Sequence, residues 1–516
     1  MQLNSINSFL LVIKKISRNL VGRNALSNLV GRLWSAALSL LTVPIFISYL
    51  GPEAYGLVGL YASFEVIFTF LDLGLSATVN REIARNIGTG KPGQESKNLL
   101  RTFEYFYWAI GFGVAFLIAV FAGWIAHNWV IIDVLSPEQV QKSIYMMALM
   151  FAARWPMNLY IGAFRGLQKQ FLQNIISIAA ATLRVITALF ILIFISNQVT
   201  IFLFWQAISC GMEILFLLIF SWRELNKISQ ERPRIDLRII KQVWKFALSF
   251  NLVGVLGMIL SSAGSLIASK FVNLSEIGYY SVASTAAGSM TLIAYSIGNA
   301  LYPRFAANTA RNDSNIVRND FHRSVRVINY FTFAFCSILI LFPSYILYLW
   351  TRDENIVFHT SLLLIFLASA SLFNSMANPS YSLLVASGNT RIPLLCNLVN
   401  LLVFIPALVI LLPIYGIVSA AICWLLENVI SYFVYTYFAW KYILKESPTT
   451  YFIIDIIPYL LICLIWFLSG KILCLLLNNT LIELFVIVIV TIGYFLSMAP
   501  RIIKDVSFKD PECVYP

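Results

Sequence analysis

Six ionisable side chains in the first half of the sequence interrupt stretches that are otherwise apolar: Arg32, Glu65, Asp72, Arg154, Arg184 and Glu213. A charge inside a bilayer costs at least ~2.5 kcal/mol on insertion scales, so such residues usually face a cavity or a partner of opposite charge. We therefore predict that this group lines a polar, partly cationic cavity. Structural ion pairs that only hold helices together are the alternative interpretation.

The three arginines of this group are the candidate substrate-binding residues. A guanidinium is planar and donates parallel hydrogen bonds to two phosphate oxygens, so it can replace the hydration of a diphosphate head group. The three carboxylates would balance the arginines or take up protons. The sequence assigns no catalytic residue and no metal ligand.

Spacing predicts how two of the carboxylates lie. Glu65 and Asp72 are seven residues apart, which places them on one face of a continuous helix. At 1.5 Å per residue, Arg32 and Asp72 would lie about 7 and about 10 Å from the cytoplasmic ends of their helices. An ion pair between Arg32 and Asp72 is therefore feasible, although Arg32 could instead extend its long side chain to the interface.

The elements that must position these residues are membrane-spanning helices. Of 516 residues, 59% are hydrophobic and 12% are charged, whereas a soluble domain carries about 25% charged residues. The mean hydropathy is +0.80. Because a spanning helix needs about 20 apolar residues, we predict an all-α polytopic membrane protein with about 14 transmembrane helices. They run near 27–50, 55–79, 104–126, 143–164, 171–195, 200–221, 246–270, 278–302, 327–350, 359–386, 392–414, 416–439, 453–475 and 481–499.

Basic residues predict the orientation of these helices. The N-terminus, the alternate connections and the C-terminus together contain 29 of the 36 Lys and Arg residues. Cytoplasmic segments carry such an excess under the positive-inside rule. Both termini are therefore predicted to be cytoplasmic. The basic patches lie between spanning helices, so nucleic-acid binding is not expected.

An internal repeat and a basic mid-chain loop predict two lobes. The run Asn28-Leu29-Val30-Gly31 recurs as Asn251-Leu252-Val253-Gly254 at the start of the seventh helix. Six helices of equal orientation in each half favour a parallel repeat around a central cavity. The predicted parts are an amphipathic cytoplasmic segment (1–24), an N-terminal lobe (25–221), a basic linker (222–245), a C-terminal lobe (246–440), two added helices (453–499) and a cytoplasmic tail (500–516).

Other function classes lack the residues that they need. The seven Cys show no CxxC spacing and only three His occur, so neither a disulfide framework nor a zinc site is expected, and no cofactor is implied. The longest external connection, about 127–142, contains only Asp133 and Glu138 as acidic residues. No nucleophile–base arrangement is visible, which disfavours a membrane glycosyltransferase or polymerase.

Two motifs within Asn28–Ala84 carry a family resemblance. They are the turn Leu50-Gly51-Pro52-Glu53-Ala54-Tyr55-Gly56 and the run Asp72-Leu73-Gly74-Leu75 before Arg81. The segment resembles the start of polysaccharide transporters of the O-antigen flippase (Wzx-type) group. That group belongs to the superfamily of multidrug, oligosaccharidyl-lipid and polysaccharide exporters, whose members have two six-helix lobes.

The resemblance implies a flippase of the bacterial inner membrane. Its substrate would be an undecaprenyl-diphosphate-linked O-antigen repeat unit, carried from the cytoplasmic to the periplasmic leaflet by alternating access. It also implies coupling to H⁺ or Na⁺, contact with membrane lipid, and an O-antigen polymerase and a chain-length regulator as partners. Two alternatives stay open: a flippase for lipid II or another lipid-linked glycan, and a multidrug-type cation antiporter.

Overall fold

The computed structural model describes residues 20–69, 72, 74–89, 93–236, 252–311, 313–446, 448–477 and 480–506. In this part of the chain every regular element is a helix, and one isolated bridge joins Ile131 to Asn273. The predicted all-α polytopic fold is confirmed. Most of the predicted N-terminal segment, the linker from 237 onward and the tail from 507 onward lie outside the described residues.

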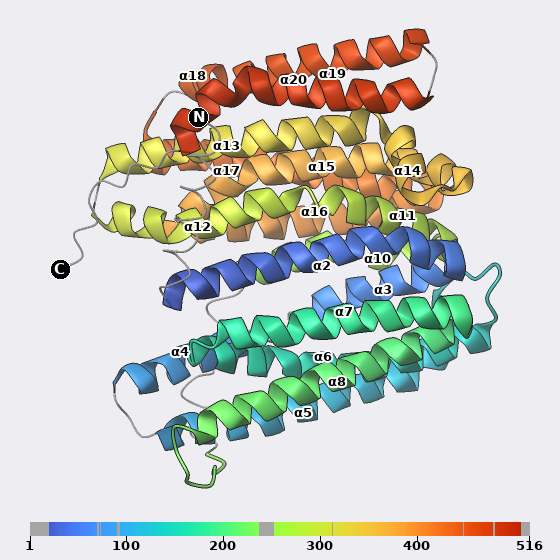
Figure 1. Cartoon of the computed structure of the whole chain (residues 1–516), viewed down its shortest axis with the longest axis vertical. Coiled ribbons are helices and arrows are strands. Elements are labelled where there is room, and N and C mark those ends of the chain that lie inside the picture. The colour runs from blue at the N-terminus through green and yellow to red at the C-terminus, as the bar shows by residue number, and fades with distance from the viewer. Residues whose placement is uncertain are drawn as a thin grey trace, which may run out of the picture. The chain divides into compact units, whose positions relative to one another are not determined.

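The chain divides into two compact units (Figure 1). The first unit is Met1–Ser262 with Asn273–Gly278, and the second is Ala263–Val272 with Tyr279–Pro516. The lobe boundaries inferred from the sequence stay a prediction.

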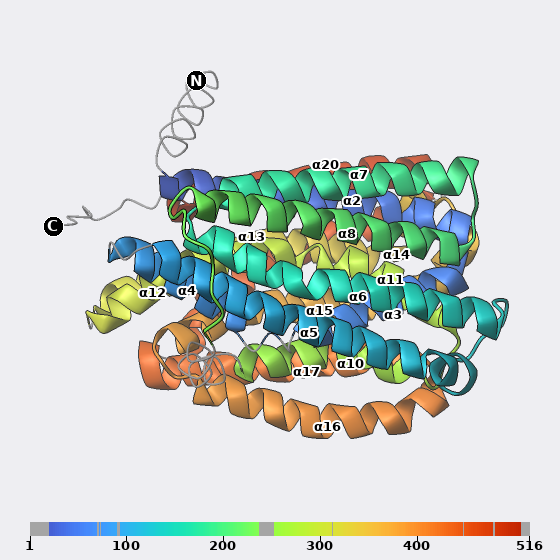
Figure 2. The same cartoon turned by 90° about the horizontal axis from the view of Figure 1, so that it is seen from below.

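The first unit contains a set of long helices that run lengthwise beside one another (Figure 2). They are α2 (Leu20–Leu50), α3 (Pro52–Thr69), α4 (Leu75–Gly88), α5 (Gly93–Trp124), α6 (Pro137–Gly166), α7 (Gln170–Phe194) and α8 (Val199–Asn226). Helix α6 packs against α4, α5 and α8, and α2 packs against α7. Short π-helical turns extend α5 and occur again in the second unit, at Ile125–Trp129, Trp440–Leu444 and Phe452–Ile456.

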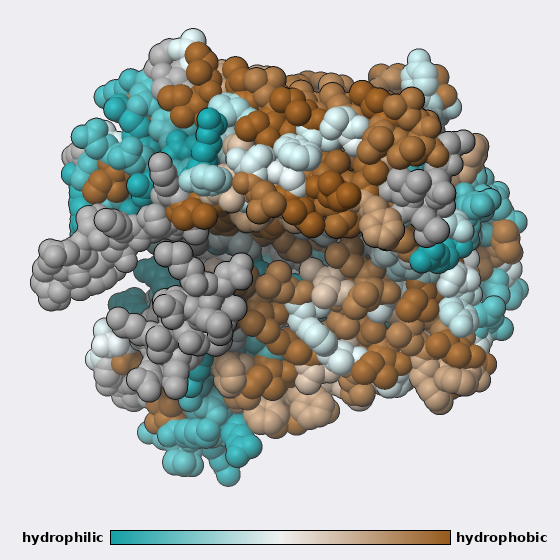
Figure 3. Space-filling view, turned by 45° about the horizontal axis from the view of Figure 1, so that its top comes forward, coloured by the Kyte–Doolittle hydropathy of each residue, from teal (hydrophilic) through white to brown (hydrophobic). Residues whose placement is uncertain are grey.

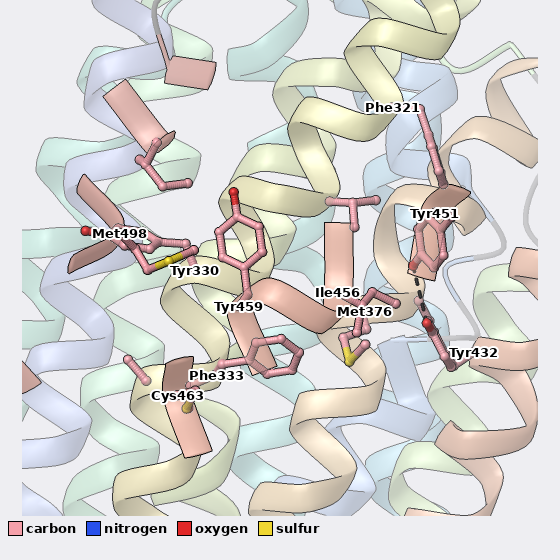
Figure 4. Close-up of a cluster of buried hydrophobic side chains, with 14 of the residues drawn as sticks. Phe321, Tyr330, Phe333, Met376, Tyr432, Tyr451, Ile456, Tyr459, Cys463 and Met498 are labelled. Atoms are coloured by element: carbon pink, nitrogen blue, oxygen red, sulfur yellow. Dashed lines mark hydrogen bonds between the residues drawn. The ribbon is translucent and has the colours of Figure 1, made fainter. Parts of the chain in front are cut away.

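The remaining helices are α10 (Leu252–Ala268), α11 (Leu274–Gly288), α12 (Thr291–Ala310), α13 (Ser314–Leu341), α14 (Pro343–Thr351), α15 (Glu354–Ala386), α16 (Arg391–Tyr415), α17 (Val418–Ala439), α18 (Pro448–Tyr451), α19 (Ile457–Leu477) and α20 (Thr480–Val506). Within the second unit, α15 packs against α12, α13 and α17, and α13 packs against α19 and α20. A core of aromatic side chains, including Tyr330, Phe333 and Tyr459, fills the space between these helices (Figure 4).

Each of the predicted spans falls on one or two of these helices. The span near 55–79 is split into α3 and α4, because Gly74 adopts a left-handed conformation with φ of 77°. The span near 278–302 is split into α11 and α12, and the span near 327–350 is split into α13 and α14. Among the described residues, ten helices are long and apolar enough to cross a membrane. The space-filling view shows a broad hydrophobic band with hydrophilic side chains gathered at its two ends (Figure 3).

Helix α6 begins at a capping box and then approaches α4 closely. The Ser136 side chain accepts from the Gln139 backbone N–H at 3.2 Å, and the Gln139 side chain accepts from the Ser136 N–H at 3.0 Å. Farther along, a Cβ atom built on Gly162 would lie 2.5 Å from the Ser76 carbonyl oxygen on α4. Glycine at this position therefore sets how closely α6 and α4 can pack.

The motif Leu50–Gly56, which runs from the end of α2 into the first turn of α3, has a clear structural role. The Glu53 carboxylate accepts backbone N–H groups from Asp133 at 2.7 Å, Val134 at 2.7 Å and Leu135 at 3.0 Å. Three such bonds to one buried carboxylate fix the connection between α5 and α6 against the start of α3.

Candidate functional site

Four of the six predicted site residues line one cavity of the first unit. The cavity has a volume of about 290 Å³. Its charged lining consists of Glu65 on α3, Arg154 on α6, Arg184 on α7 and Glu213 on α8. Four different helices thus bring two arginines and two glutamates to a single polar space within a helical membrane protein.

The helical repeat explains which neighbours share this space. On α6, Asn158 and Ile161 follow Arg154 by four and seven residues, and all three line the cavity. On α7, Ser177 precedes Arg184 by seven residues and also lines it. Residues at these separations lie on one helical face. The neutral polar residues Asn158 and Ser177 are absent from the sequence prediction, although their spacing from the arginines was the signal that could have identified them.

The first ion pair of the cavity joins Arg154 to Glu65. The Arg154 Nη1 atom contacts the Glu65 carboxylate, and the side chains are 29% and 31% exposed. The Arg154 Nε atom also lies 3.5 Å from the Cys210 sulfur. Because about a third of each side chain remains accessible, this pair can be reached from the cavity.

The second ion pair joins Arg184 to Glu213 and is more deeply buried. The side chains are only 12% and 13% exposed, and Arg184 Nη2 contacts the Glu213 carboxylate. The Arg184 Nε atom is buried and has no hydrogen-bond partner among the described residues. The pair therefore keeps one guanidinium donor that nothing in the described part of the chain satisfies.

Asp72 lies outside this cavity. Its carboxylate accepts hydrogen bonds from the Tyr107 hydroxyl and, at 2.7 Å, from the Ser76 hydroxyl. The break between α3 and α4 separates Asp72 from the helix that carries Glu65, so the expectation of one continuous helical face is wrong. Asp72 instead stabilises the start of α4 and its contact with α5.

Arg32 also lies outside the cavity, and it does not form the ion pair with Asp72 that the sequence makes feasible. Arg32 is an exposed residue of α2, and no ion pair joins it to a described carboxylate. Equal depth along two helices does not fix the direction in which their side chains point, and here the carboxylate is satisfied by hydroxyl groups. Arg32 therefore remains only a predicted substrate-binding residue.

A metal-binding group is not seen in the described ranges. Within those ranges no three His, Cys, Asp or Glu side chains gather in a way that could hold a metal ion. The chemistry that the cavity can perform is binding and exchange. Each guanidinium has five N–H donors, so an anion with several oxygens could bind the arginines as the carboxylates move away or take up protons.

Two family models and two named bacterial proteins match the chain. A family model described as polysaccharide biosynthesis protein matches residues 21–309, and a second one, described as MatE, matches residues 251–411. A protein of Shigella flexneri named "Putative O-antigen transporter" is 22% identical over 410 residues, which cover 78% of this chain and 93% of that protein. A Klebsiella pneumoniae protein named "Uncharacterized membrane protein in cps region" is 26% identical over 227 residues, 44% of this chain and 46% of that protein.

Solved structures with the same fold include two transporters. A lipid II flippase MurJ in an inward closed conformation has a TM-score of 0.71 and 14% identity, with 92% of this chain and 99% of that chain covered. A multidrug resistance MATE family transporter in an inward-facing conformation has a TM-score of 0.65 and 15% identity, with 80% and 96% covered. At these identities the likeness concerns the fold.

Proposed function

We propose that this chain, which belongs to the polysaccharide biosynthesis protein family, is a flippase for a lipid-linked oligosaccharide. The family match confirms the resemblance first drawn from Asn28–Ala84, and the chain is a multi-pass membrane protein of the polysaccharide transporter type. The substrate proposed is an undecaprenyl-diphosphate-linked O-antigen repeat unit. The movement proposed is from the cytoplasmic to the periplasmic leaflet of the inner membrane.

One observation carries the proposal: two arginine–glutamate pairs line a single cavity inside a helical membrane protein. A sugar diphosphate cannot cross hydrocarbon without partners that replace its water. Arginine offers those partners in a geometry that matches phosphate oxygens. In the empty state the glutamates would satisfy the arginines, and in the loaded state the phosphates would do so.

The glutamates give the cycle its link to an ion gradient. When phosphate replaces a carboxylate at Arg154 or Arg184, that carboxylate loses its counter-charge in a poorly solvated site. Binding of H⁺ or Na⁺ to Glu65 or Glu213 would then remove most of the cost of an unpaired buried charge. Release of the ion would restore the pairs and expel the diphosphate.

Complementation tests the proposed function. The chain would be expressed in a bacterium that lacks its own O-unit flippase and has matching glycosyltransferases, and polymerised O-antigen would be measured on the cell surface. We expect wild-type protein to restore it and Arg154→Ala plus Arg184→Ala to abolish it at equal membrane abundance. A matched control is Arg81→Ala plus Arg85→Ala, which removes two exposed arginines of α4.

Two outcomes would redirect the proposal. Well-inserted wild-type protein that restores growth of cells depleted of their lipid II flippase, but not O-antigen, would make lipid II or a similar glycan lipid the substrate. Full activity of the double Arg→Ala variant would contradict the role of the cavity, and the ion pairs would then be structural.

A further inference from the structure

A second cavity of the first unit lies between α7 and α8, which run side by side in both ribbon views (Figures 1 and 2). Its volume is about 230 Å³, and its lining is mainly apolar. We call this cavity the α7–α8 groove. Small residues make the room, since Ala179 and Ala180 occupy positions where a larger side chain would fill the space.

The outer edge of the α7–α8 groove faces the surface of the unit. Ile175 and Leu183 on α7 are 47% and 51% exposed, and Phe216 on α8 is 50% exposed. Exposed apolar side chains on membrane-spanning helices are solvated by hydrocarbon rather than by water. The groove therefore opens towards the lipid chains of the bilayer.

The floor of the groove, formed by Arg184, Ser209 and Glu213, is polar, whereas its walls are apolar. Arg184 and Glu213 line both the groove and the polar cavity, so the two spaces meet at this ion pair. Two donors at the floor, Arg184 Nε and the Ser209 hydroxyl, are buried and have no hydrogen-bond partner among the described residues. Buried polar groups in proteins are nearly always paired, so each such group calls for an explanation.

Apolar packing against the walls of the groove does not explain its buried, unpaired donors. A hydrocarbon chain alone would cover the apolar walls but would leave both buried donors, Arg184 Nε and the Ser209 hydroxyl, without a partner. A ligand that carries phosphate at the end of a hydrocarbon chain satisfies the walls and the floor together. The groove and the polar cavity, which share Arg184 and Glu213 in their linings, then match the tail, the diphosphate and the glycan of one molecule.

We propose that the α7–α8 groove holds the start of the polyprenyl chain of a lipid-linked diphosphate, whose phosphate oxygens bind Arg184 and Ser209 and whose glycan occupies the polar cavity. This inference rests on the proposed function and adds the path of the lipid. At about 30 Å³ per water molecule, the groove has room for a short stretch of chain. The rest of the chain stays in the bilayer while the head group crosses.

Photo-labelling of the full-length protein in nanodiscs tests the proposal. The probe is undecaprenyl diphosphate with a diazirine on the isoprene unit next to the diphosphate. We expect labelled residues on α7 and α8 within the groove, and we expect excess unlabelled undecaprenyl diphosphate to remove the label whereas excess phosphatidylglycerol does not. Ala180→Trp, which fills the groove, should reduce this competed label by about tenfold or more, equivalent to ~1.4 kcal/mol.

Matched variants separate loss of the site from loss of the fold. Ile186→Trp places the same bulk on α7 at a residue that is 59% exposed and does not line the groove, and it should leave the label unchanged. If Ala180→Trp fails to insert, Ala179→Leu provides a smaller obstruction. Both variants would be compared at equal elution of folded protein on size exclusion.

The outcomes distinguish this inference from the function on which it rests. Competed label outside the groove would overturn the lipid path and leave the diphosphate-lipid substrate in place. Label that phosphatidylglycerol removes equally well would mean that any lipid fills the groove, and the inference would fail. Absence of competed label anywhere in the chain would overturn both proposals.

Discussion

The charged side chains of the polar cavity cancel one another, which determines what a substrate must do to bind. Arg154 faces Glu65 and Arg184 faces Glu213, so the four side chains carry no net charge as ion pairs. An anionic substrate can form an ion pair with one of these arginines only if the partner glutamate moves away or is neutralised. Exchange between two partners of the same arginine is a simple physical basis for a binding and release cycle.

A variant that removes both charges of the Arg184–Glu213 pair tests whether the pair serves transport or only holds the helices together. In Arg184→Gln plus Glu213→Gln, two amides of similar reach replace the ions and can still bond to each other. Replacing both partners of a buried pair often leaves stability nearly unchanged, so we expect normal membrane abundance. Transport should fall about tenfold or more, because a neutral amide binds diphosphate more weakly by at least ~1.4 kcal/mol.

The matched control for this variant is Trp34→Phe, which removes the hydrogen bond from α2 to Thr182 on α7 without changing a charge. Surface O-antigen per unit of inserted protein is the quantity to compare. Retained transport in the Gln–Gln variant would mean that the pair only holds α7 to α8.

The sequence could predict the members of these pairs but not their pairing. Arginines and carboxylates stood out because each interrupts an apolar stretch, and four of the six do meet in one cavity. Arg32 and Asp72 do not join them. Position along a helix gives depth, whereas the rotation of the helix decides which neighbour a side chain faces, and that rotation depends on tertiary packing.

At the scale of single elements, breaks in three of the predicted spans, near 55–79, 278–302 and 327–350, are the main departure from the sequence prediction. Apolar composition continues across the joints between α3 and α4 and between α11 and α12, so a hydropathy rule merges each pair. The local signal was Gly74, which permits a left-handed residue inside an apolar run. Discontinuous helices in both halves of a transporter often lie near a substrate site.

The contact between α6 and α4 should be intolerant of added volume. Gly162→Val places atoms where the Ser76 carbonyl oxygen already lies, and overpacking of this kind costs ~1–3 kcal/mol. We expect less folded protein and a lower midpoint in a heating series followed by fluorescence-detected size exclusion. Gly113→Val on α5 has no atom within 4 Å of the added Cβ and should behave like wild type. Equal behaviour of the two variants would contradict close packing at Gly162.

The two C-terminal helices of the second unit depend on one arginine of α13. Arg326 donates to Asp455 at 2.8 Å and to Asp505 at 2.7 Å, and so joins α13 to the segments before α19 and at the end of α20. Arg326→Gln leaves the fully buried Asp455 with fewer partners, and breaking a buried pair from one side costs ~3–5 kcal/mol. We expect faster proteolysis in the connection that precedes α19.

The control for that prediction lies three residues earlier on the same helix. Arg323 forms no ion pair with any described carboxylate, so Arg323→Gln removes the same charge without breaking a contact. Similar cleavage rates for the two variants would show that net charge, and not the Arg326 contacts, holds α19 and α20 in place.

At the scale of the whole molecule, composition predicted the class and the order of the helices, while the packing of helices within each unit needed coordinates. Low charge and long apolar runs are enough to predict a polytopic helical protein, because a bilayer admits few other folds. The polar cavity depends on contacts among α3, α6, α7 and α8, which lie far apart in the sequence. Only weak sequence signals, such as Asn158 four residues after Arg154, pointed to those contacts.

The proposed direction of transport depends on how the protein is oriented in the membrane. The distribution of Lys and Arg residues predicts that orientation. The segments assigned to the cytoplasm hold 29 of the 36 Lys and Arg residues, and moving such residues across a membrane is unfavourable. Green fluorescent protein fused after Pro516 should therefore fluoresce, and alkaline phosphatase at the same site should be inactive. Phosphatase fused after Asp133, in an external connection, should be active. The reverse pattern at both sites would place the termini in the periplasm. That result would contradict the predicted orientation and, with it, the proposed direction of transport.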